Sequence, residues 1–325
     1  MPKNNKLNVN EKKILALLDQ NARMPFSLIG KRLKKSQQQV SFIVDRLKKR
    51  DIIKSFYTII DYSKLDILNF RVYFKVSYVN EKKLDEFIKY LISDPYSSWV
   101  SSCGGRYDVI CTFFASNVSQ FNKHLRSIIE QFPEQINTFS VLTTIILRNF
   151  GRKYLSVKPA NNELFVGGDR IPEILDEIDL VILKNLSEDA RKSSVEISNS
   201  LNVTPKTIIN RIKSLENKQI ILGYKPLINL QSINYTPVLI LIKFHNISSV
   251  LENELVNYLK FNSNVFSLVK TIGEWDMEIT IETQDQKQVR KIELEIRQKF
   301  ALLIQQIELI PLYQPHKMRF MPGIV

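Results

Sequence analysis

The second half of this chain repeats the first half in one constant register. The offset is 168 residues, the distance from Ala22-Arg23 to Ala190-Arg191, and most other matched positions keep their apolar or polar character. A register maintained over that length indicates one structural unit used twice, so we expect the chain to fold like a covalent dimer. Further identities are Leu33 and Leu201, Leu47 and Leu215, Ile52-Ile53 and Ile220-Ile221, Lys75 and Lys243, Gly105 and Gly273, and Asp108 and Asp276.

The two copies differ in charge. The net charge of the 325 residues is +13, which favours a polyanionic partner. Residues 1–60 contain 14 Lys and Arg against four Asp and Glu, whereas residues 169–228 contain nine of each. The first copy therefore carries the excess charge that attracts phosphate.

Several classes of protein are disfavoured. Residues 1–13 are polar and basic, without the apolar core of a secretory signal. No run approaches the roughly 18 apolar residues of a membrane helix, so we expect no membrane partner. Cys103 and Cys111 lie in apolar stretches, which indicates buried thiols in a reducing, cytoplasmic setting. The three scattered histidines complete no metal cluster, and we expect neither a metal nor a cofactor.

Three short helical patterns open each copy. In the first copy Asn10 is placed to cap the first helix, Pro25 opens the second, and Ser36 caps a third that runs from Gln37 to about Arg50. In the second copy Thr204 caps the third helix. Three short helices, the last two joined by a tight turn, indicate a helix-turn-helix, here present twice.

After each third helix the apolar period changes to that of strands. Residues 56–60 and 224–228 are extended, and Phe70 to Val76 alternate as a half-buried strand whose other face carries Arg71 and Tyr73. The remaining pattern gives the order βαββαβ, a ferredoxin-like unit. We therefore predict an α+β fold, with two winged helix-turn-helix domains alternating with two ferredoxin-like domains by internal duplication.

This interpretation divides the chain into five segments. They are a helix-turn-helix domain at 1–60, a ferredoxin-like domain at 61–150, a polar linker at 151–172, a second helix-turn-helix domain at 173–228 and a second ferredoxin-like domain at 229–325.

The third helices carry side chains suited to reading DNA. Gln and Asn bind adenine edges, Arg binds guanine, Ser and Thr bind base or phosphate, and nearby basic residues hold phosphates. The partner expected is double-stranded DNA, although the same side chains would suit a solvated helix face, more so in the uncharged second copy. The candidates are Lys31, Arg32, Lys34, Lys35, Ser36, Gln37, Gln38, Gln39, Ser41 and Arg46, and in the second copy Thr204, Lys206, Thr207, Asn210 and Arg211.

The whole pattern resembles the Lrp/AsnC (feast/famine) family of prokaryotic regulators. The first copy departs from it, because Ile43 stands in the place of Arg211 and Lys54-Ser55-Phe56 replaces Leu222-Gly223-Tyr224. The residues that carry the resemblance are Leu175-Asp176-Glu177-Ile178-Asp179, Asp189-Ala190-Arg191, Arg211-Ile212-Lys213-Ser214-Leu215-Glu216, Ile220-Ile221-Leu222-Gly223-Tyr224, Gly273-Glu274-Trp275-Asp276 and Gly105-Arg106-Tyr107-Asp108.

The resemblance implies dimerisation through the ferredoxin-like sheets (RAM-type domains), recognition helices in successive major grooves, self-association, and an amino-acid effector sensed at the sheet interfaces. The same turn residues also suit a structural role, because Gly permits positive φ and Asp caps the backbone. By resemblance, the residues near the dimer contact or effector pocket are Gly105, Tyr107, Asp108, Gly273, Trp275 and Asp276.

Two other functions stay open. Fused sirohaem decarboxylases resemble this tandem architecture, but they carry a His-rich strand and an Asn-Met-Trp-Phe-like strand where this chain has Ser101-Ser102-Cys103 and Val109-Ile110-Cys111. Without those histidines the obvious proton donors are missing, and we expect no catalytic residues. A small-molecule sensor acting by protein contact is the second alternative. We interpret the chain as a DNA-binding transcription regulator and not an enzyme, one chain supplying what a dimer normally supplies.

Overall fold

The computed structural model describes residues 7–77, 81–156, 163–245 and 248–321, which form two compact units. Unit 1 comprises the described residues of Met1–Leu65, Gly151–Asn234 and Arg319–Val325. Unit 2 comprises those of Asp66–Phe150 and Tyr235–Met318. Each unit thus draws on both copies of the repeat. Within the predicted linker, residues 157–162 lie outside the described residues.

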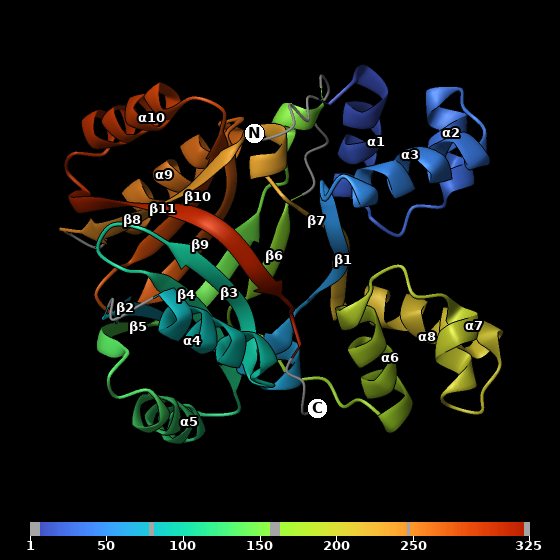
Figure 1. Cartoon of the computed structure of the whole chain (residues 1–325), viewed down its shortest axis with the longest axis horizontal. Coiled ribbons are helices and arrows are strands. Elements are labelled where there is room, and N and C mark those ends of the chain that lie inside the picture. Colours follow the sequence, from blue (N-terminus) through green and yellow to red (C-terminus); the bar gives the residue numbers. More distant parts are fainter. Residues whose placement is uncertain (1–6, 78–80, 157–162, 246–247, 322–325) are drawn as a thin grey trace. The chain divides into compact units, whose positions relative to one another are not determined.

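Unit 1 contains both predicted helix-turn-helix domains (Figure 1). The expected cap of the first helix is wrong: the side chain of Asn8, not Asn10, accepts a hydrogen bond from the backbone N–H of Glu11. The backbone N–H of Asn8 in turn donates to the carboxylate of Glu11, which completes a capping box. The caps predicted at Ser36 and Thr204 are confirmed. The helices are α1 (Val9–Gln20), α2 (Phe26–Leu33), α3 (Gln37–Lys49), α6 (Glu177–Glu188), α7 (Ser194–Asn199) and α8 (Pro205–Asn217).

A two-stranded antiparallel ribbon lies between these domains. It joins β1 (Ile53–Ile60) to β7 (Ile221–Ile228), and its register sets Tyr57 opposite Lys225. We call positions 168 residues apart equivalent; Tyr57 and Lys225 are such a pair, so the ribbon has a local twofold axis at this point. The predicted extended stretches are confirmed, but the sequence did not indicate that they pair with each other. Unit 1 also contains the short elements η1 (Tyr62–Leu65), η2 (Lys153–Leu155), β6 (Leu164–Gly167) and η3 (Gln231–Ile233).

Unit 2 confirms the order βαββαβ in both copies. The first copy supplies β2 (Leu68–Val76), α4 (Glu81–Ser93), β3 (Ser97–Cys103), β4 (Val109–Ala115), α5 (Val118–Gln131) and β5 (Ile136–Asn149). The second supplies β8 (Thr236–Phe244), α9 (Ser249–Phe261), β9 (Val265–Ile272), β10 (Met277–Thr283), α10 (Gln286–Lys299) and β11 (Ile304–Met318).

The strands of unit 2 form one continuous sheet that closes on itself. Their order is β2-β4-β3-β11-β8-β10-β9-β5, and β5 also pairs with β2. The long last strand of each copy pairs with a strand of its own copy and with one of the other, β5 with β2 and β9, and β11 with β8 and β3. The two ferredoxin-like domains are therefore joined by backbone hydrogen bonds.

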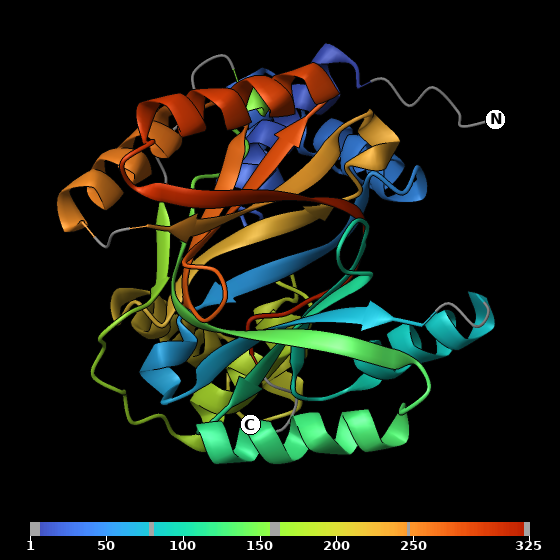
Figure 2. The ribbon, with the colours of Figure 1, turned by 90° about the vertical axis from the view of Figure 1, so that its left-hand side faces the viewer.

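Both faces of these strands are covered. Helices α4 and α5 pack on one side of the unit and α9 and α10 on the opposite side (Figure 2). The inward face forms a third core that includes Tyr73, Tyr107 and Trp275. The sequence predicted a half-buried β2, yet both of its faces are covered, with Arg71 6 % and Tyr73 0 % exposed. Buried on both sides, these strands fix the turns at residues 104–108 and 273–276.

Candidate nucleic-acid interface

The outward side of α3 presents the amides proposed to read DNA. Gln37, Gln38 and Gln39 are exposed in the first turn of the helix, and Ser41 is half-buried. Gln39 has a local role as well, since its side-chain oxygen accepts a hydrogen bond from the backbone N–H of Ser36 at 3.0 Å. This capping box fixes the start of the helix and thus the direction in which its first side chains point.

A buried carboxylate braces the same helix. Glu11 on α1 is 1 % exposed, and its Oε1 lies 2.9 Å from Nη2 of Arg46 and 2.6 Å from Nη1 of Arg50. Arg46 lies in the last turn of α3, and Arg50, four residues later, is the C-cap of this helix. Arg46 is therefore held between two helices, which orients it for any contact with DNA.

The second domain has a different brace. Nη1 of Arg211 on α8 lies 2.7 Å from a carboxylate oxygen of Asp176 and 3.4 Å from one of Asp179. The hydrogen bond from the backbone N–H of Asp179 holds the pKa of Asp176 below its ordinary value. Burial and the neighbouring Asp176 raise the pKa of Asp179. Arg211 thus pairs with two carboxylates, whereas in the first domain one carboxylate pairs with two arginines.

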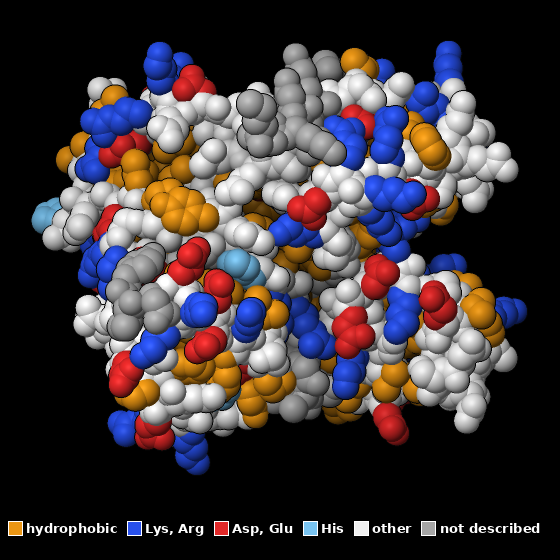
Figure 3. Space-filling view, viewed as in Figure 1, with side chains coloured by type: hydrophobic (Ala, Val, Ile, Leu, Met, Phe, Trp, Pro, Cys, Tyr) orange, Lys and Arg blue, Asp and Glu red, His pale blue; other side chains and the backbone are white. Residues whose placement is uncertain are grey.

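The basic candidates surround α3 on the surface. Lys31 and Arg32 occupy the last turn of α2, and Lys34 and Lys35 form the turn to α3. Lys34 has a left-handed backbone with φ of 54°, which ends α2 sharply. On the face in Figure 3, Lys and Arg side chains gather over α1 to α3, while acidic and basic side chains alternate over α6 to α8. In the second domain Lys206 and Asn210 are exposed, as is Thr204, and Thr207 is half-buried.

The two domains hold each other through reciprocal hydrogen bonds at equivalent positions. The guanidinium of Arg23 donates to the carbonyls of Ala190 (2.7 Å) and Lys192 (2.9 Å), and that of Arg191 donates to the carbonyls of Ala22 and Met24. In addition, the backbone N–H of Ala22 donates to Tyr224, and that of Ala190 to Phe56. Each domain is thus anchored to the ribbon strand of the other copy.

Unit 1 contains two equivalent sets of buried or packed residues, of which one is charged and the other is not. Asp19 on α1 pairs with Arg152 (2.9 Å) and Lys225 (3.6 Å), and all three side chains are buried. Burial alone would raise the pKa of Asp19, but the two cations hold it below its ordinary value. The equivalent residues are Ser187, Phe320 and Tyr57, and the last two stack with ring centroids 5.9 Å apart.

The candidate effector residues lie in two equivalent turns of unit 2. Asp108 accepts a hydrogen bond from the N–H of Val76 (2.8 Å) and pairs with Lys75, and Asp276 does the same with Phe244 and Lys243. Tyr107 is 3 % and Trp275 1 % exposed, both in the inner core. Gly105 and Gly273 have φ of 86° and 147°, which side chains rarely adopt. These contacts give all six residues structural roles, and an effector contact stays a prediction.

Sequence comparison places both helix-turn-helix domains in known families. Residues 175–216 match the AsnC-type helix-turn-helix domain, and residues 7–54 match a winged helix-turn-helix DNA-binding domain. The chain is 39 % identical over 103 residues to the HTH-type transcriptional regulator Ptr1 of Methanocaldococcus jannaschii, covering 32 % of this chain and 68 % of that protein. The chain belongs to the Lrp/AsnC family of helix-turn-helix transcriptional regulators.

A more distant Lrp/AsnC relative is the leucine-responsive regulatory protein of Haemophilus influenzae, 23 % identical over 124 residues, 36 % of this chain and 72 % of that protein. A likeness over the full length comes from a solved structure, the sirohaem decarboxylase NirDL, with a TM-score of 0.61 and 13 % identity over 97 % of this chain and 94 % of that one. At that identity the likeness shows a shared fold alone. The duplicated architecture predicted from the sequence is therefore confirmed.

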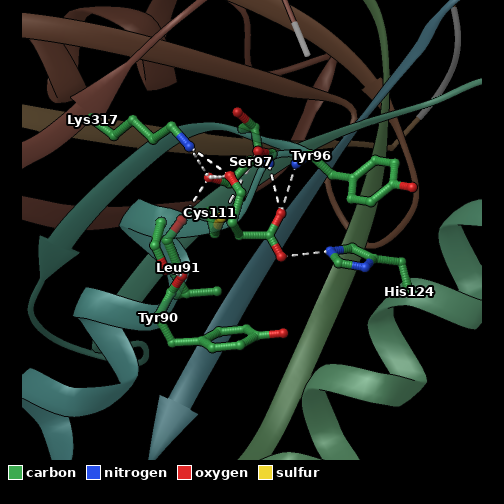
Figure 4. Close-up of polar contacts among 10 residues, drawn as sticks. Tyr90, Leu91, Tyr96, Ser97, Cys111, His124 and Lys317 are labelled. Atoms are coloured by element: carbon green, nitrogen blue, oxygen red, sulfur yellow. Dashed lines mark hydrogen bonds and ion pairs between the residues drawn. The ribbon is translucent and has the colours of Figure 1, made fainter. Parts of the chain in front are cut away.

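A histidine–carboxylate pair in this Lrp/AsnC protein bears on the enzymatic alternative. Nε2 of His124 on α5 lies 2.8 Å from a carboxylate oxygen of Asp94, and its ring packs against Tyr96 with centroids 4.5 Å apart (Figure 4). Nζ of Lys317 on β11 donates to the hydroxyl of Ser97 at 2.8 Å in the same cluster. A histidine held in this way has the contacts of a structural residue.

The inner core holds an ion pair that sequence reasoning missed. Nε of Arg71 on β2 lies 2.6 Å from Oε2 of Glu278 on β10, and the two side chains are 7 % and 0 % exposed. Burial and the negative charge of Glu278 raise the pKa of the nearby Tyr73. The equivalent positions are apolar, Leu239 and Ile110. In the sequence, Arg71 lies between Phe70 and Val72 and Glu278 between Met277 and Ile279, so each charged residue is flanked by apolar ones.

No site for a metal is formed by the described residues, which contain no suitable group of three or more His, Cys, Asp or Glu side chains. Cys103 and Cys111 are free and buried, as predicted. Burial, and then the charge of Asp108, raise the pKa of Cys103 to about 12. None of the helices in the described ranges is both long and apolar enough to cross a membrane.

Proposed function

We propose that this Lrp/AsnC regulator binds double-stranded DNA as a single-chain pseudo-dimer, with two non-equivalent helix-turn-helix domains on a pseudo-palindromic site. The observation that carries the proposal is the β1–β7 ribbon, in which Tyr57 lies opposite its own equivalent, Lys225. A local twofold axis between two recognition helices is what a palindromic operator requires of a dimer. Here one polypeptide supplies both halves.

The first domain is proposed to contribute most of the electrostatic affinity. Its excess of basic residues and the basic surface around α3 support this assignment. The second domain, with equal numbers of acidic and basic residues, would contribute a weaker half-site or a contact with a partner. The contacts to bases are assigned to the exposed polar residues of α3 and α8, and those to phosphates to the lysines and arginines beside them.

A salt-titrated electrophoretic shift series tests this division. We expect Lys34→Glu with Lys35→Glu to weaken binding more than the matched pair Lys206→Glu with Lys213→Glu. Each lost phosphate contact should also flatten the slope of log affinity against log salt by about 0.9. Equal losses in the two double variants would contradict the division. Weak binding without salt dependence would favour the alternative of a sensor that acts by protein contact.

Two further parts of the proposal concern regulation. We propose that the cytoplasmic protein self-associates and that an amino-acid effector acts at the turns holding Tyr107 and Trp275. Support comes from the position of these turns, which meet across the pseudo-twofold axis of unit 2 through Arg106 and Glu274. A thermal-shift screen of the amino acids, followed by light scattering with each hit, tests both. If no amino acid shifts the unfolding temperature, the proposed amino-acid effector is contradicted.

We also propose that the protein is not an enzyme. The strands that resemble those of sirohaem decarboxylases carry serine, cysteine and aliphatic residues in place of the expected proton donors, and His124 is engaged by Asp94. Incubation with sirohaem followed by an absorbance scan tests this. A change in the tetrapyrrole spectrum that grows with time would support the decarboxylase instead.

A further inference from the structure

An exposed phenylalanine lies on the face of α3 that carries the candidate base-reading residues. Phe42 is 66 % exposed, although Val40 and Val44, two residues away on either side, are buried. On a helix, residues spaced by three, four and seven share one face. Counting from Gln38, this face comprises Ser41, Phe42 and Asp45. Phe42 therefore lies on the exposed face of α3 that carries residues proposed to read bases in the major groove.

The ring of Phe42 has a braced neighbour. The guanidinium carbon of Arg46, one turn further along α3, lies 5.9 Å from the centroid of the Phe42 ring. Arg46 is fixed in turn by the buried Glu11. A cation held over one face of the ring limits the directions the ring can take, so the outer edge of Phe42 is presented in a defined orientation.

The major groove offers a specific partner for an apolar side chain. The four base pairs present donors and acceptors there, but only thymine adds an apolar group, the C5-methyl, and phenylalanine is among the side chains that contact it. The basic residues around α3 supply the attraction to phosphate that would bring this helix to DNA.

We infer that Phe42 contacts the C5-methyl group of a thymine and is a specificity-determining residue of the first half-site. The inference rests on the proposed binding of DNA. The equivalent residue in the second domain is the exposed Asn210, whose amide suits the edge of adenine. The two half-sites therefore differ at matching positions, one read through a methyl group and the other through hydrogen bonds.

Replacement of single thymines by deoxyuridine tests this contact, because it removes the methyl group and leaves base pairing intact. Bound sites are first selected from a random duplex pool with the full chain, and each thymine is then replaced in turn. For the unchanged protein we expect one thymine in one half-site whose replacement weakens binding about fourfold, as expected for one buried methyl group. Phe42→Ala should weaken binding to the thymine site by a similar factor and remove the sensitivity to that replacement.

Two matched variants complete the test. Phe42→Leu should keep part of the methyl sensitivity, because an apolar contact remains. Ile209→Ala removes another exposed apolar residue, 44 % exposed on α8, and should leave the effect at the same thymine unchanged. Equal methyl sensitivity in Phe42→Ala and the unchanged protein would overturn the inference while leaving DNA binding intact. A change in self-association without a change in methyl sensitivity would also overturn it. Absence of DNA binding would overturn the proposed function and the inference together.

Discussion

Arg106 and Glu274 occupy equivalent positions of the two copies, and their side chains meet, with Nη2 of Arg106 2.6 Å from Oε1 of Glu274. In a symmetric dimer of identical chains, a residue at this place would face its own copy and therefore its own charge. Duplication within one chain removes that constraint. The two copies have acquired opposite charges where they meet, so the pairing of first copy with second is favoured over either copy with itself.

Charge reversal at this contact tests its contribution. Both side chains are more than a third exposed, so Arg106→Glu should lower the free energy of unfolding by no more than about 1 kcal/mol. The double variant Arg106→Glu with Glu274→Arg should recover part of the loss, because the pair is restored with reversed polarity. Urea unfolding of the unchanged protein, of the single variants Arg106→Glu and Glu274→Arg, and of the double variant, at low and high salt, measures this. Losses that simply add in the double variant would show that the two residues do not interact.

Asp19 should be the more important residue for the stability of unit 1. Asp19→Asn leaves Lys225 and Arg152 buried without their carboxylate, and loss of one partner from such a group typically costs about 3–5 kcal/mol. The matched control is Ser187→Ala at the equivalent position, where we expect about 1 kcal/mol or less. Chemical unfolding followed by circular dichroism compares them. Similar losses in the two variants would contradict the importance of the charged cluster.

The same residue predicts the response to acid. The pKa of Asp19 is lower in the folded protein than the ordinary value of about 3.9. Its stabilisation is therefore complete above that ordinary value and is lost as the pH falls through the lower pKa of the folded state. The free energy of unfolding of the unchanged protein should fall by up to about 1.4 kcal/mol per pH unit over this range. Asp19→Asn should reduce the dependence of the free energy of unfolding on pH in this range. An unchanged slope in that variant would show that Asp19 does not cause the response to acid.

The contribution of the buried pair Arg71–Glu278 to stability can be tested by introducing the apolar residues that occupy the equivalent positions. Arg71→Leu alone leaves Glu278 as a buried, unpaired charge and should cost about 3–5 kcal/mol. Arg71→Leu with Glu278→Ile reproduces the equivalent residues, Leu239 and Ile110, and should restore most of the stability. A double variant as unstable as the single one would mean that the ion pair itself stabilises unit 2. Thermal unfolding of the three proteins is the measurement.

Periodicity and the internal repeat were sufficient to predict the order of helices and strands. They were not sufficient for contacts between distant segments. The sequence indicated that residues 56–60 and 224–228 are extended, but such a pattern does not indicate which strand pairs with which. Arg71 and Tyr73 alternate with apolar residues, which indicated a solvated face, whereas closure of the sheet buries that face.

Some features of the candidate site were readable in the sequence and others were not. Asn8 and Glu11 have the spacing of a capping box, whereas Asn10 is followed three residues later by Lys13. Phe42 stands among the polar residues of α3, but its exposure is not evident from the sequence, because most apolar residues in a helix belong to the core. The bracing of Arg46 by Glu11 joins two helices and depends on how they pack.

The reciprocal anchoring of the two helix-turn-helix domains has a consequence for dosage. A regulator made of separate subunits must first assemble, so its active fraction falls when the cell makes little of it. In this chain the second helix-turn-helix domain is always present at a high effective concentration beside the first. At concentrations below those at which chains self-associate, promoter occupancy would then scale linearly with the number of polypeptides, and a few molecules could regulate a promoter.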